Sequence, residues 1–389
     1  MLKHAGTTSP YGPYKPVVVK VNTDTGIYGL GEAGVSMGIG EHALAGMLMD
    51  IAPYYIGRNP MDNEVIWEEM RTKINGHISG GGAVYYGSLS AFDTALTDIK
   101  GKALNIPVYQ LLGGKQNADL RCYYSMMQAG TGGDLSPRGT AEEYAQTAEK
   151  IMNAGFDAAK IAPLYFDRDK SVLGDRRIVT PLTSYSLNLM EERLKAIRDV
   201  GGKGFDIIVE YFCSLDSRSA IQADAVAARY GVFYCEEPVL PMKRKLFKSL
   251  HENTHVPLAT GEKIHTRWQY SDLFEDSSVD IIQPDISNCG GISETKKICD
   301  MAHIYGVKAQ IHIAGTPIAT AAALQVEAAI PNFFIHEYFY LNEAAEYADY
   351  CTCDYKPVNG KIKVPDLPGI GQDLSDKAVA EALSHIVID

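Results

Sequence analysis

The chain has 389 residues, of which 46% are hydrophobic and 22% are charged, and its formal net charge is -12. This composition is typical of a soluble globular protein with about two or three domains. An acidic chain without a basic run is poorly suited to nucleic acid or an anionic membrane, although a metal ion could let it bind an anionic substrate. We therefore expect a small-molecule ligand, no nucleic acid and no membrane.

The cysteines are odd in number and scattered along the chain, and no pair of CxxC motifs indicates a zinc site. This usage is typical of a reducing compartment. The N-terminus has no apolar signal core, and no apolar run approaches the ~20 residues needed to span a bilayer. These features predict a cytoplasmic protein.

The first part of the chain mixes strand and helix patterns. Two β-rich runs flank residues 24–26, which carry a hairpin signal, and helical patterns follow at 40–57, 61–74 and 89–104. Residues 75–87 are rich in glycine, which indicates either a flexible connection or a mobile lid over a site.

From Leu120 onward, strand-like and helix-like stretches alternate eight times, which predicts a parallel (β/α)8-type barrel. An open doubly wound sheet is the main alternative, but no GxGxxG turn follows the first strand. After Tyr340 the pattern decays into a tail with a Pro-Gly turn and short strands, which we expect to fold back on the N-terminal part.

The later predicted strands end in chemically capable side chains. They are spaced by 23 to 27 residues, about the length of one βα unit, and they are Glu210, Glu236 (or Glu237), Glu262, Asp285, His312 and Glu337. The second predicted strand ends in Lys160. In such a barrel, these positions face one crevice at the C-terminal ends of the strands, where active sites lie.

Three carboxylates on adjacent strands repel one another strongly, and a hard divalent cation with oxygen ligands resolves that conflict. A network of Arg or Lys is the alternative, but Lys160 and Lys263 are the only evident local cations in the sequence. The acidic strand ends therefore predict a Mg²⁺ site.

Asp285 and His312 follow neighbouring predicted strands, so the carboxylate can orient the imidazole and raise its basicity, as proton abstraction requires. A purely structural hydrogen bond is the alternative. Lys160 lies across the predicted barrel, where it could bind a substrate carboxylate or, with a lowered pKa, move protons. A metal that binds the substrate carboxylate acidifies the adjacent carbon, which makes removal of its proton the predicted first step.

Nearly the whole chain resembles the enolase superfamily, in its mandelate racemase-like subgroup. The resemblance rests on "AFDTALTDIKGKALNIPVYQLLGG", on "EEP", "GE" and "QPD", on the histidine of the seventh strand, and on the "DLPGIGQ" tail. The stretches "ATGEKIHTRW", "DIIQPDISNCGGISE" and "IPNFFIHE" are similar to acid-sugar dehydratases that act on galactonate or mannonate.

The resemblance implies a capping domain of residues 1–117, joined by residues 346–389, over a barrel of residues 118–345. It also implies an even-numbered homo-oligomer. One Mg²⁺ would be held by Glu210, Glu236 and Glu262, with Glu237 second to Glu236. Glu337 would hydrogen-bond the substrate carboxylate and the enediolate.

The resemblance implies that the catalytic residues are His312, Asp285, Lys160 and Glu337. Cap loops near residues 3–14 and 72–87 would select the substrate, an aldonate or an aldarate. The candidate substrate-binding residues are His265, His77, Tyr85 and Tyr14.

The chain departs from the family pattern in several places. Glu210 stands where aspartate is more usual. Phe212 replaces a histidine that serves several acid-sugar dehydratases as the acid for the departing hydroxyl. Ala162 replaces the second lysine of racemases, and we expect one strand fewer before "PVVVKV".

Three functions are consistent with these residues. The first is a Mg²⁺-dependent dehydratase that converts an acid sugar to a 2-keto-3-deoxy acid. The second is a racemase or epimerase that uses Lys160 and His312 on opposite faces of the substrate. The third is a catalytically weak homologue that binds an acid sugar, which Phe212 favours.

Overall fold

A computed structural model describes residues 1, 8–9, 12–13, 15–34, 40–74, 81–173 and 180–389 of the chain. Near its start, β1 (Thr8–Ser9) pairs with β2 (Gly12–Pro13). The predicted hairpin follows, because β3 (Val17–Asn22) pairs antiparallel with β4 (Tyr28–Ala33). Gly26 in its turn has a φ of 83°, a left-handed conformation that glycine adopts without steric cost.

Helices cover this hairpin. They are α1 (Glu41–Ile51), α2 (Asn63–Glu69), the π-helical segment η3 (Met70–Ile74) and α3 (Ala83–Leu104), with the short 3-10 turns η1 (Ala52–Tyr54) and η2 (Pro60–Asp62). Helix α3 packs directly on β4. A Cβ on Gly29 or Gly31 would lie 1.9 Å from a carbonyl oxygen of α3, so this close packing requires glycine.

Helix α3 starts earlier than the sequence pattern predicts. The glycine-rich loop was expected to run to Gly87, but the helix begins at Ala83, directly after Gly81 and Gly82, which have φ values of 75° and 90°. Tyr85 and Tyr86 therefore lie in the first turns of a helix and not in a loop. Residues 75–80 of the expected loop lie outside the described part of the chain.

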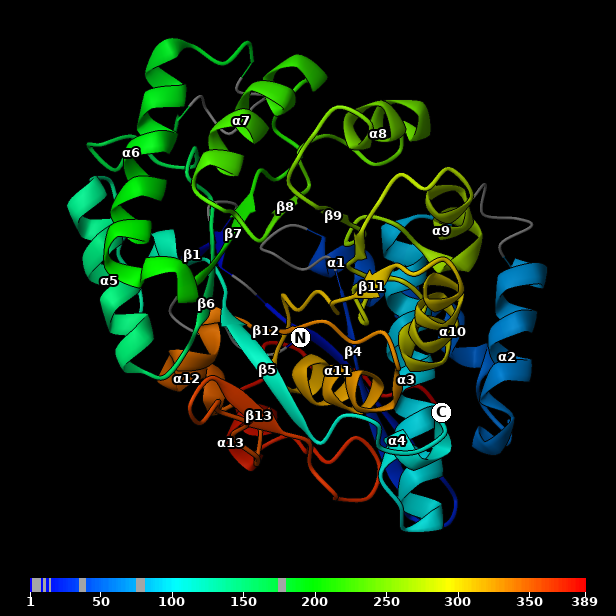
Figure 1. The fold of residues 1–389 in the computed structure, drawn as a ribbon. Helices are drawn as coiled ribbons and strands as arrows, with labels where there is room; N and C mark the ends of the chain where they lie inside the picture. The colour runs from blue at the N-terminus through cyan, green and yellow to red at the C-terminus, as the bar shows by residue number, and fades with distance from the viewer. Residues whose placement is uncertain (2–7, 10–11, 14, 35–39, 75–80, 174–179) are drawn as a thin grey trace.

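Eight parallel strands form the barrel (Figure 1). They pair in the order β11-β10-β9-β8-β7-β6-β5-β12, and a parallel bridge between Ala309 and Phe333 joins β11 to the segment before β12. The predicted (β/α)8-type barrel with an N-terminal cap is confirmed. The strands are β5 (Asp119–Tyr124), β6 (Ala158–Ile161), β7 (Asp206–Glu210), β8 (Tyr234–Glu236), β9 (Leu258–Thr260), β10 (Ile281–Ile282), β11 (Lys308–Ala309) and β12 (His336–Tyr338).

Seven helices follow the first seven strands: α5 (Ala141–Asn153), α6 (Ser184–Gly201), α7 (Ser217–Arg229), α8 (Arg244–His251), α9 (Thr266–Glu275), α10 (Gly291–Ile304) and α11 (Pro317–Ala329). The eighth strand is followed by the short η7 (Tyr340–Glu343) and α12 (Ala345–Ala348), so the last unit departs from the pattern. Other short elements are α4 (Val108–Leu111), η4 (Met127–Ala129), η6 (Gly202–Gly204) and α13 (Asp376–Ala380). None of the described helices has the combination of length and apolar composition needed to cross a bilayer.

An apolar layer inside the barrel supports the charged layer above it. Ile208, Tyr234 and Ile335 belong to this buried layer. Alternate strand residues point to the same face, so the residues two positions later also face the barrel interior. Those residues are Glu210, Glu236 and Glu337. In this way the strand pattern places the charged groups together at the C-terminal ends of the strands.

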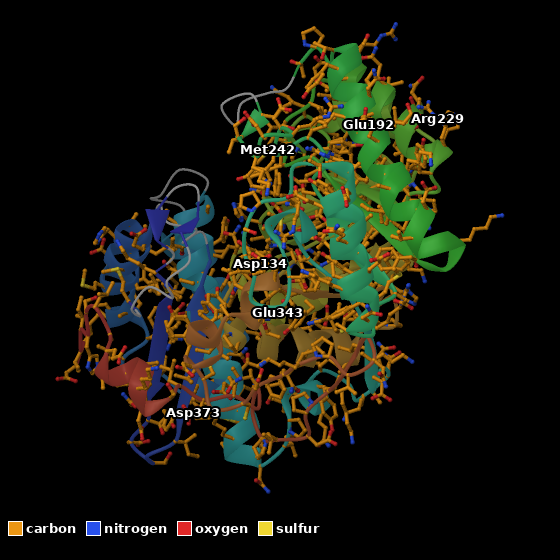
Figure 2. The ribbon with its side chains drawn as sticks, turned by 90° about the vertical axis from the view of Figure 1, so that its left-hand side faces the viewer. Asp134, Glu192, Arg229, Met242, Glu343 and Asp373 are labelled. Carbon is orange, nitrogen blue, oxygen red and sulfur yellow. The ribbon has the colours of Figure 1, made fainter. Side chains whose placement is uncertain are left out.

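The C-terminal tail contacts both parts of the molecule. Strand β13 (Lys361–Lys363) pairs antiparallel with β5 of the barrel. Further along, the Ile370 amide donates to Asp98 of α3, and the hydroxyl of Tyr28 donates to Asp373. Figure 2 shows Asp373 on the same side of the molecule as the blue N-terminal hairpin. The tail therefore folds back on the N-terminal part, as predicted, and also adds a strand beside the barrel.

Candidate active site

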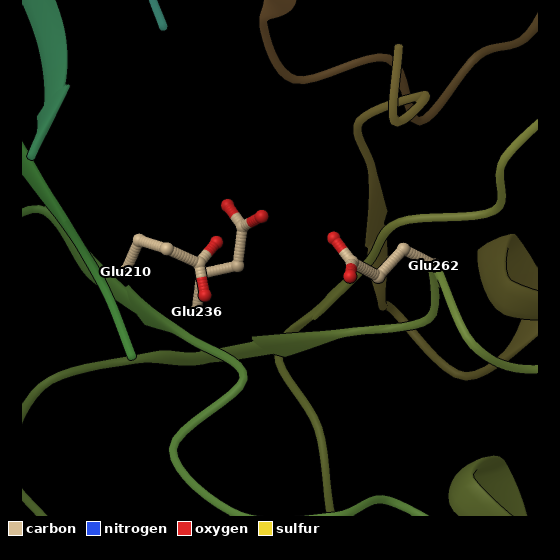
Figure 3. Close-up of side chains that lie close together, drawn as sticks. All are labelled: Glu210, Glu236 and Glu262. Atoms are coloured by element: carbon tan, nitrogen blue, oxygen red, sulfur yellow. The ribbon is translucent and has the colours of Figure 1, made fainter. Parts of the chain in front are cut away.

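Three glutamates meet at the C-terminal ends of neighbouring strands (Figure 3). Glu210 ends β7, Glu236 ends β8, and Glu262 follows β9 by two residues. One oxygen from each lies within 4.8 Å of the others, so the three could hold a metal ion together. The predicted acidic cluster is thus brought together in space.

Lys160 of β6 lies beneath this cluster. Its Nζ is 2.7 Å from Glu236, 2.9 Å from Glu337 and 3.7 Å from Glu210, and the side chain is 3% exposed. Burial lowers the pKa of Lys160, but the charges of Glu236, Glu337 and Glu210 outweigh it and raise the pKa well above its ordinary value. In this structure its carboxylate partners thus raise the pKa of Lys160, whereas one of its two expected roles needs a lowered pKa.

The donor set fits a divalent cation. Oε2 of Glu210 and Oε2 of Glu236 are buried and have no hydrogen-bond partner among the described residues. Burial and the charge of Glu236 raise the pKa of Glu210 well above its ordinary value. A buried carboxylate oxygen without a partner is costly, and a hard cation is the partner that such oxygens prefer.

The second glutamate of the "EE" pair points elsewhere. Glu237 is fully buried and has a φ of 47°, which turns its side chain away from the cluster. Its carboxylate accepts from Thr260 Oγ1, from the Gly261 amide at 3.3 Å and from Lys263 Nζ at 3.0 Å. Lys263 in turn pairs with Glu262. Glu237 therefore supports the loop that carries Glu262, and Glu236 is the residue that lies in the cluster.

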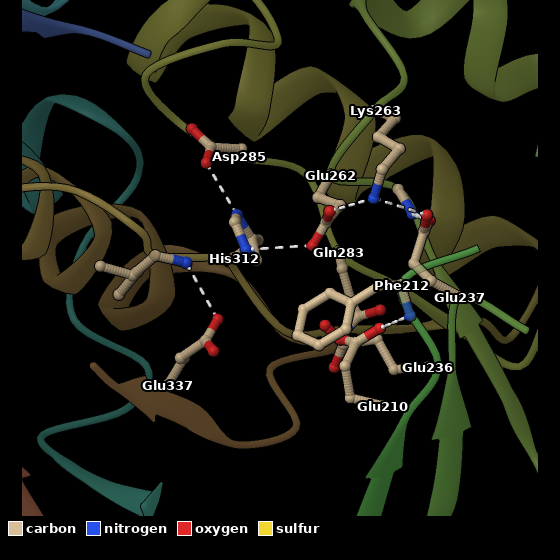
Figure 4. Close-up of polar contacts among 12 residues, drawn as sticks. Glu210, Phe212, Glu236, Glu237, Glu262, Lys263, Gln283, Asp285, His312 and Glu337 are labelled. Carbon is tan, nitrogen blue, oxygen red and sulfur yellow. Dashed lines mark hydrogen bonds and ion pairs between the residues drawn. The ribbon is translucent and has the colours of Figure 1, made fainter. Parts of the chain in front are cut away.

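The Asp285–His312 pair forms as predicted (Figure 4). His312 Nδ1 lies 2.7 Å from Asp285 Oδ2, and Nε2 lies 3.1 Å from Glu262 Oε2. Burial lowers the pKa of His312, but the charge of Glu262 and the hydrogen bond with Asp285 outweigh it and raise the pKa to about 10. The imidazole is thus oriented by one carboxylate and lies beside the acidic cluster.

Glu337 completes the ring of charges. Its carboxylate accepts from Ser125 Oγ at 2.7 Å and from the Ile313 amide at 3.0 Å, in addition to the ion pair with Lys160. Burial raises the pKa of Glu337, but Lys160 and His312 outweigh it and lower the pKa to about 2. Glu337 is therefore ionised and firmly held.

A cavity of about 350 Å³ opens beside these residues. Its lining residues from the barrel include Glu262, His265, Asp285, Ser287, Asn288 and His312. Glu32 and Gly34 of the N-terminal part also line it. The cavity thus lies where the cap meets the C-terminal ends of the strands.

Comparison with known proteins decides the family. The profile described as mandelate racemase / muconate lactonizing enzyme, N-terminal domain matches residues 5–113, and the profile described as enolase C-terminal domain-like matches residues 143–378. The chain belongs to the enolase superfamily. The first match covers most of the residues before the barrel, and the second runs from α5 into α13 of the tail.

Relatives in this superfamily are similar along the whole chain. D-xylonate dehydratase from Haloferax volcanii is 31% identical over 376 residues, which cover 96% of this chain and 86% of that protein. D-galactonate dehydratase from Ralstonia pickettii is 29% identical, with 95% and 91% covered. A solved structure of an enolase superfamily member from Salmonella Typhimurium has a TM-score of 0.91 and 43% identity, with 94% of each chain covered.

Of the four residues expected to bind substrate, the structure describes two, and it places one of them at the cavity. His265 lines the cavity, but the buried Tyr85 donates from its hydroxyl to the Met70 carbonyl at 2.6 Å and is not among the lining residues. The hydroxyl of Tyr85 is therefore engaged within the cap, and Tyr85 does not line the cavity. His77 and Tyr14 lie outside the described residues.

Phe212 follows the acidic cluster directly. Phe212 and Cys213 have φ values of 51° and 57°, and this turn lets the Phe212 amide donate to Glu210 Oε1 at 2.5 Å. The ring is 37% exposed and lies edge-to-face with Tyr165 at 5.5 Å. The backbone amide of Phe212 thus holds the carboxylate of Glu210 in place. The side chain of Phe212 cannot donate a proton.

Sequence reasoning missed Glu32, a buried residue of β4 whose carboxylate accepts from the amide and the hydroxyl of Thr316 at the start of α11. An acid inside the otherwise apolar "YGLGEA" strand was the available signal. The sequence also did not predict that Glu237 binds Thr260, Gly261 and Lys263, because two consecutive glutamates do not indicate which of them points into the cluster.

Proposed function

We propose that this chain is a Mg²⁺-dependent acid-sugar dehydratase. One observation carries the proposal: the three clustered glutamates and the Asp285–His312 pair line or adjoin one cavity. This combination supports removal of a proton next to a carboxylate. The relatives named D-xylonate dehydratase and D-galactonate dehydratase support an acid sugar, an aldonate or an aldarate, as the substrate.

Glu210, Glu236 and Glu262 would hold the cation. When bound, Mg²⁺ would supply positive charge that stabilises the negative charge developing on the substrate carboxylate as the α-proton leaves. Lys160, already paired with two of these acids, contributes positive charge from below. Glu337, held by Ser125 and Ile313, would hydrogen-bond the substrate carboxylate only after taking up a proton, because two ionised carboxylates can only accept.

His312 would act as the base. Asp285 holds its Nδ1, which leaves Nε2 to take the proton from the α-carbon. In the structure, Glu262 contacts both Lys263 and His312. Coordination of a cation by Glu262 would compete with these contacts. It would offset the charge that most raises the pKa of His312, so that the ring could be neutral and Nε2 free to take a proton.

The β-hydroxyl then leaves as water. Phe212 cannot supply the proton that this hydroxyl needs, so His312 would return the proton that it removed. The C–H and C–O bonds would then break on the same face of the substrate. The resulting enol takes a proton at the β-carbon and loses one from its hydroxyl to give a 2-keto-3-deoxy acid.

The racemase alternative finds less support in the geometry. It requires a second base opposite His312, and Lys160 is enclosed by three carboxylates with which it already forms ion pairs. The exposed Phe212 does favour a second candidate function, a homologue that binds an acid sugar without turning it over.

One assay tests these proposals. Purified protein with Mg²⁺ is incubated with a panel of aldonates and aldarates, and 2-keto acid is detected with semicarbazide. Formation of keto acid supports the dehydratase. Solvent deuterium at the α-carbon without keto acid would point to a racemase, and thermal stabilisation by a panel member without either reaction would point to a binding homologue.

A further inference from the structure

His265 lies in the loop between β9 and α9, three residues after Glu262. It lines the same cavity as Glu262, Asp285 and His312, and it is 8% exposed. The acid cluster and the Asp285–His312 pair have roles in the reaction proposed above. The imidazole of His265 has none there, although it faces the space in which a substrate would lie.

The hydrogen bonding of His265 defines its tautomer. Nδ1 is 3.1 Å from the carbonyl oxygen of Asn288. A carbonyl oxygen can only accept, so the proton is on Nδ1, and in the neutral ring Nε2 carries the lone pair. Burial lowers the pKa of His265, which favours this neutral form.

Nε2 remains available to a ligand. It has no hydrogen-bond partner among the described residues, and it is not fully buried. Nε2 of His336, by contrast, has no partner and is fully buried. The two histidines therefore differ. Nε2 of His336 is sealed inside the protein, whereas Nε2 of His265 is not, and His265 lines the cavity.

The ring of His265 is also held in place. It stacks on Tyr86 of α3, with 5.5 Å between ring centroids and 27° between planes. Tyr86 is buried and comes from the cap, whereas Asn288 comes from the barrel. Two parts of the fold thus fix the direction of Nε2, and a side chain fixed in this way loses little entropy when it binds a ligand.

We propose that His265 Nε2 accepts a hydrogen bond from a hydroxyl on the uncharged chain of the substrate, so that the enzyme prefers aldonates to aldarates. This inference rests on the proposed function. A lone pair repels a carboxylate or a carbonyl oxygen and attracts a hydroxyl proton. Glu32 and Asp285 add negative charge to the same walls.

Among the described lining residues the cationic groups are Lys263 and His312. Lys263 is already paired with Glu237 and Glu262, and His312 with Asp285 and Glu262. A second substrate carboxylate in this region would therefore meet repulsion. A neutral, hydroxylated chain would meet an acceptor of fixed direction.

The test compares each aldonate that the enzyme accepts with its analogues lacking one hydroxyl at C4, C5 or C6. We expect one missing hydroxyl to lower kcat/KM of the wild-type enzyme by about 10- to 100-fold, since it leaves a desolvated acceptor without a donor. In His265→Phe, which keeps an aromatic ring on Tyr86 but has no lone pair, that ratio should approach one. His265→Gln, which restores an acceptor, should recover part of the discrimination.

His255→Phe is the matched control, because the His255 side chain is 81% exposed. It should keep the wild-type ratio. The proposal is overturned if no deoxy position responds to His265→Phe, or if aldarates are better substrates than aldonates. Should no panel member be turned over, the same ratios are measured as dissociation constants by calorimetry. Discrimination lost in His265→Phe would then support the role of His265 although the proposed dehydration had failed, and absence of binding would overturn both.

Discussion

At the scale of single residues, His312 is the group on which proton abstraction depends. We predict that His312→Asn lowers the rate of keto-acid formation by about 10²- to 10⁴-fold, the usual contribution of a general base. The change keeps a polar side chain beside Asp285, so the fold and Mg²⁺ binding should persist, as circular dichroism and calorimetry can show. Turnover close to the wild-type rate would remove His312 from the role of base.

A second prediction at this scale concerns the acidic cluster. Glu262→Gln replaces one of the three anionic oxygen ligands by a neutral one, so it should weaken Mg²⁺ binding by about tenfold or more, measured by calorimetry. Thermal unfolding should then show a smaller stabilisation by Mg²⁺ than in the wild type. Glu252→Gln, an exposed exchange of the same kind, controls for the change in charge. Equal Mg²⁺ affinity in the two variants would contradict the ligand role.

These residues were predictable to different degrees. The spacing of the strand ends indicated Glu210, Glu262 and His312, because each strand of a parallel barrel delivers its last residues to one crevice. The choice between Glu236 and Glu237 depended on which face each side chain takes, and the sequence left it open. The structure resolves it through the inward register of Tyr234 and Glu236 and the positive φ of Glu237.

At the scale of elements, α5 begins with a capping box. Thr140 Oγ1 accepts from the Glu143 amide, and the Glu143 carboxylate accepts from the Thr140 amide. We predict that Thr140→Ala lowers the free energy of unfolding by about 1 kcal/mol, because it leaves an amide of the first turn without its acceptor. Urea unfolding measures this change, and Thr140→Ser, which keeps the hydroxyl, should stay close to the wild type.

Glu143 adds a pH dependence to the same helix start. Burial raises its pKa, but hydrogen bonds from Lys170 and from the amides of Gly139 and Thr140 outweigh it and lower the pKa from 4.5 to about 2. A carboxyl group with a lowered pKa in the folded state stabilises above its unfolded pKa and loses that effect as the pH falls. Glu143→Gln should therefore be less stable than the wild type at pH 7, and the difference should shrink between pH 4.5 and pH 2. A constant difference over this range would contradict the pairing.

The sequence predicted some helices and strands better than others. The hairpin at 17–33 and the eight strands followed from alternation and turn residues, which act locally. The predicted start of α3 was too late. Gly81, Gly82, Tyr85 and Tyr86 are typical of a loop or a strand, whereas the packing of the helix on β4 is a long-range contact. The last unit after β12 is short, in agreement with the decay of the sequence pattern after Tyr340. The pairing of β13 with β5 is a long-range contact, which no local pattern reports.

At the scale of the whole molecule, cap, barrel and tail meet through buried polar contacts between distant residues. Trp67 of α2 donates to the Gly290 carbonyl at 2.8 Å, and Asn63 donates to Ser293 at 2.9 Å. Glu32 of the N-terminal part accepts hydrogen bonds from Thr316, the N-cap residue of α11, which is the helix after His312. The cavity walls therefore depend on contacts that join segments more than 200 residues apart, and the sequence could indicate the parts but not these contacts.

Asp98 of α3 joins three such segments and carries the last prediction. Its fully buried carboxylate accepts from the Leu30 amide at 3.0 Å, from the Ile370 amide at 2.9 Å and from Lys102 Nζ at 2.6 Å. Asp98→Ala would leave two buried amides without acceptors, at about 1–3 kcal/mol for each. We therefore expect it to lower the urea midpoint far more than Asp50→Ala, an exposed exchange on α1. Similar midpoints for the two variants would show that the contact adds nothing. A loss confined to Asp98→Ala would show that the buried contact between hairpin, helix and tail stabilises the folded chain.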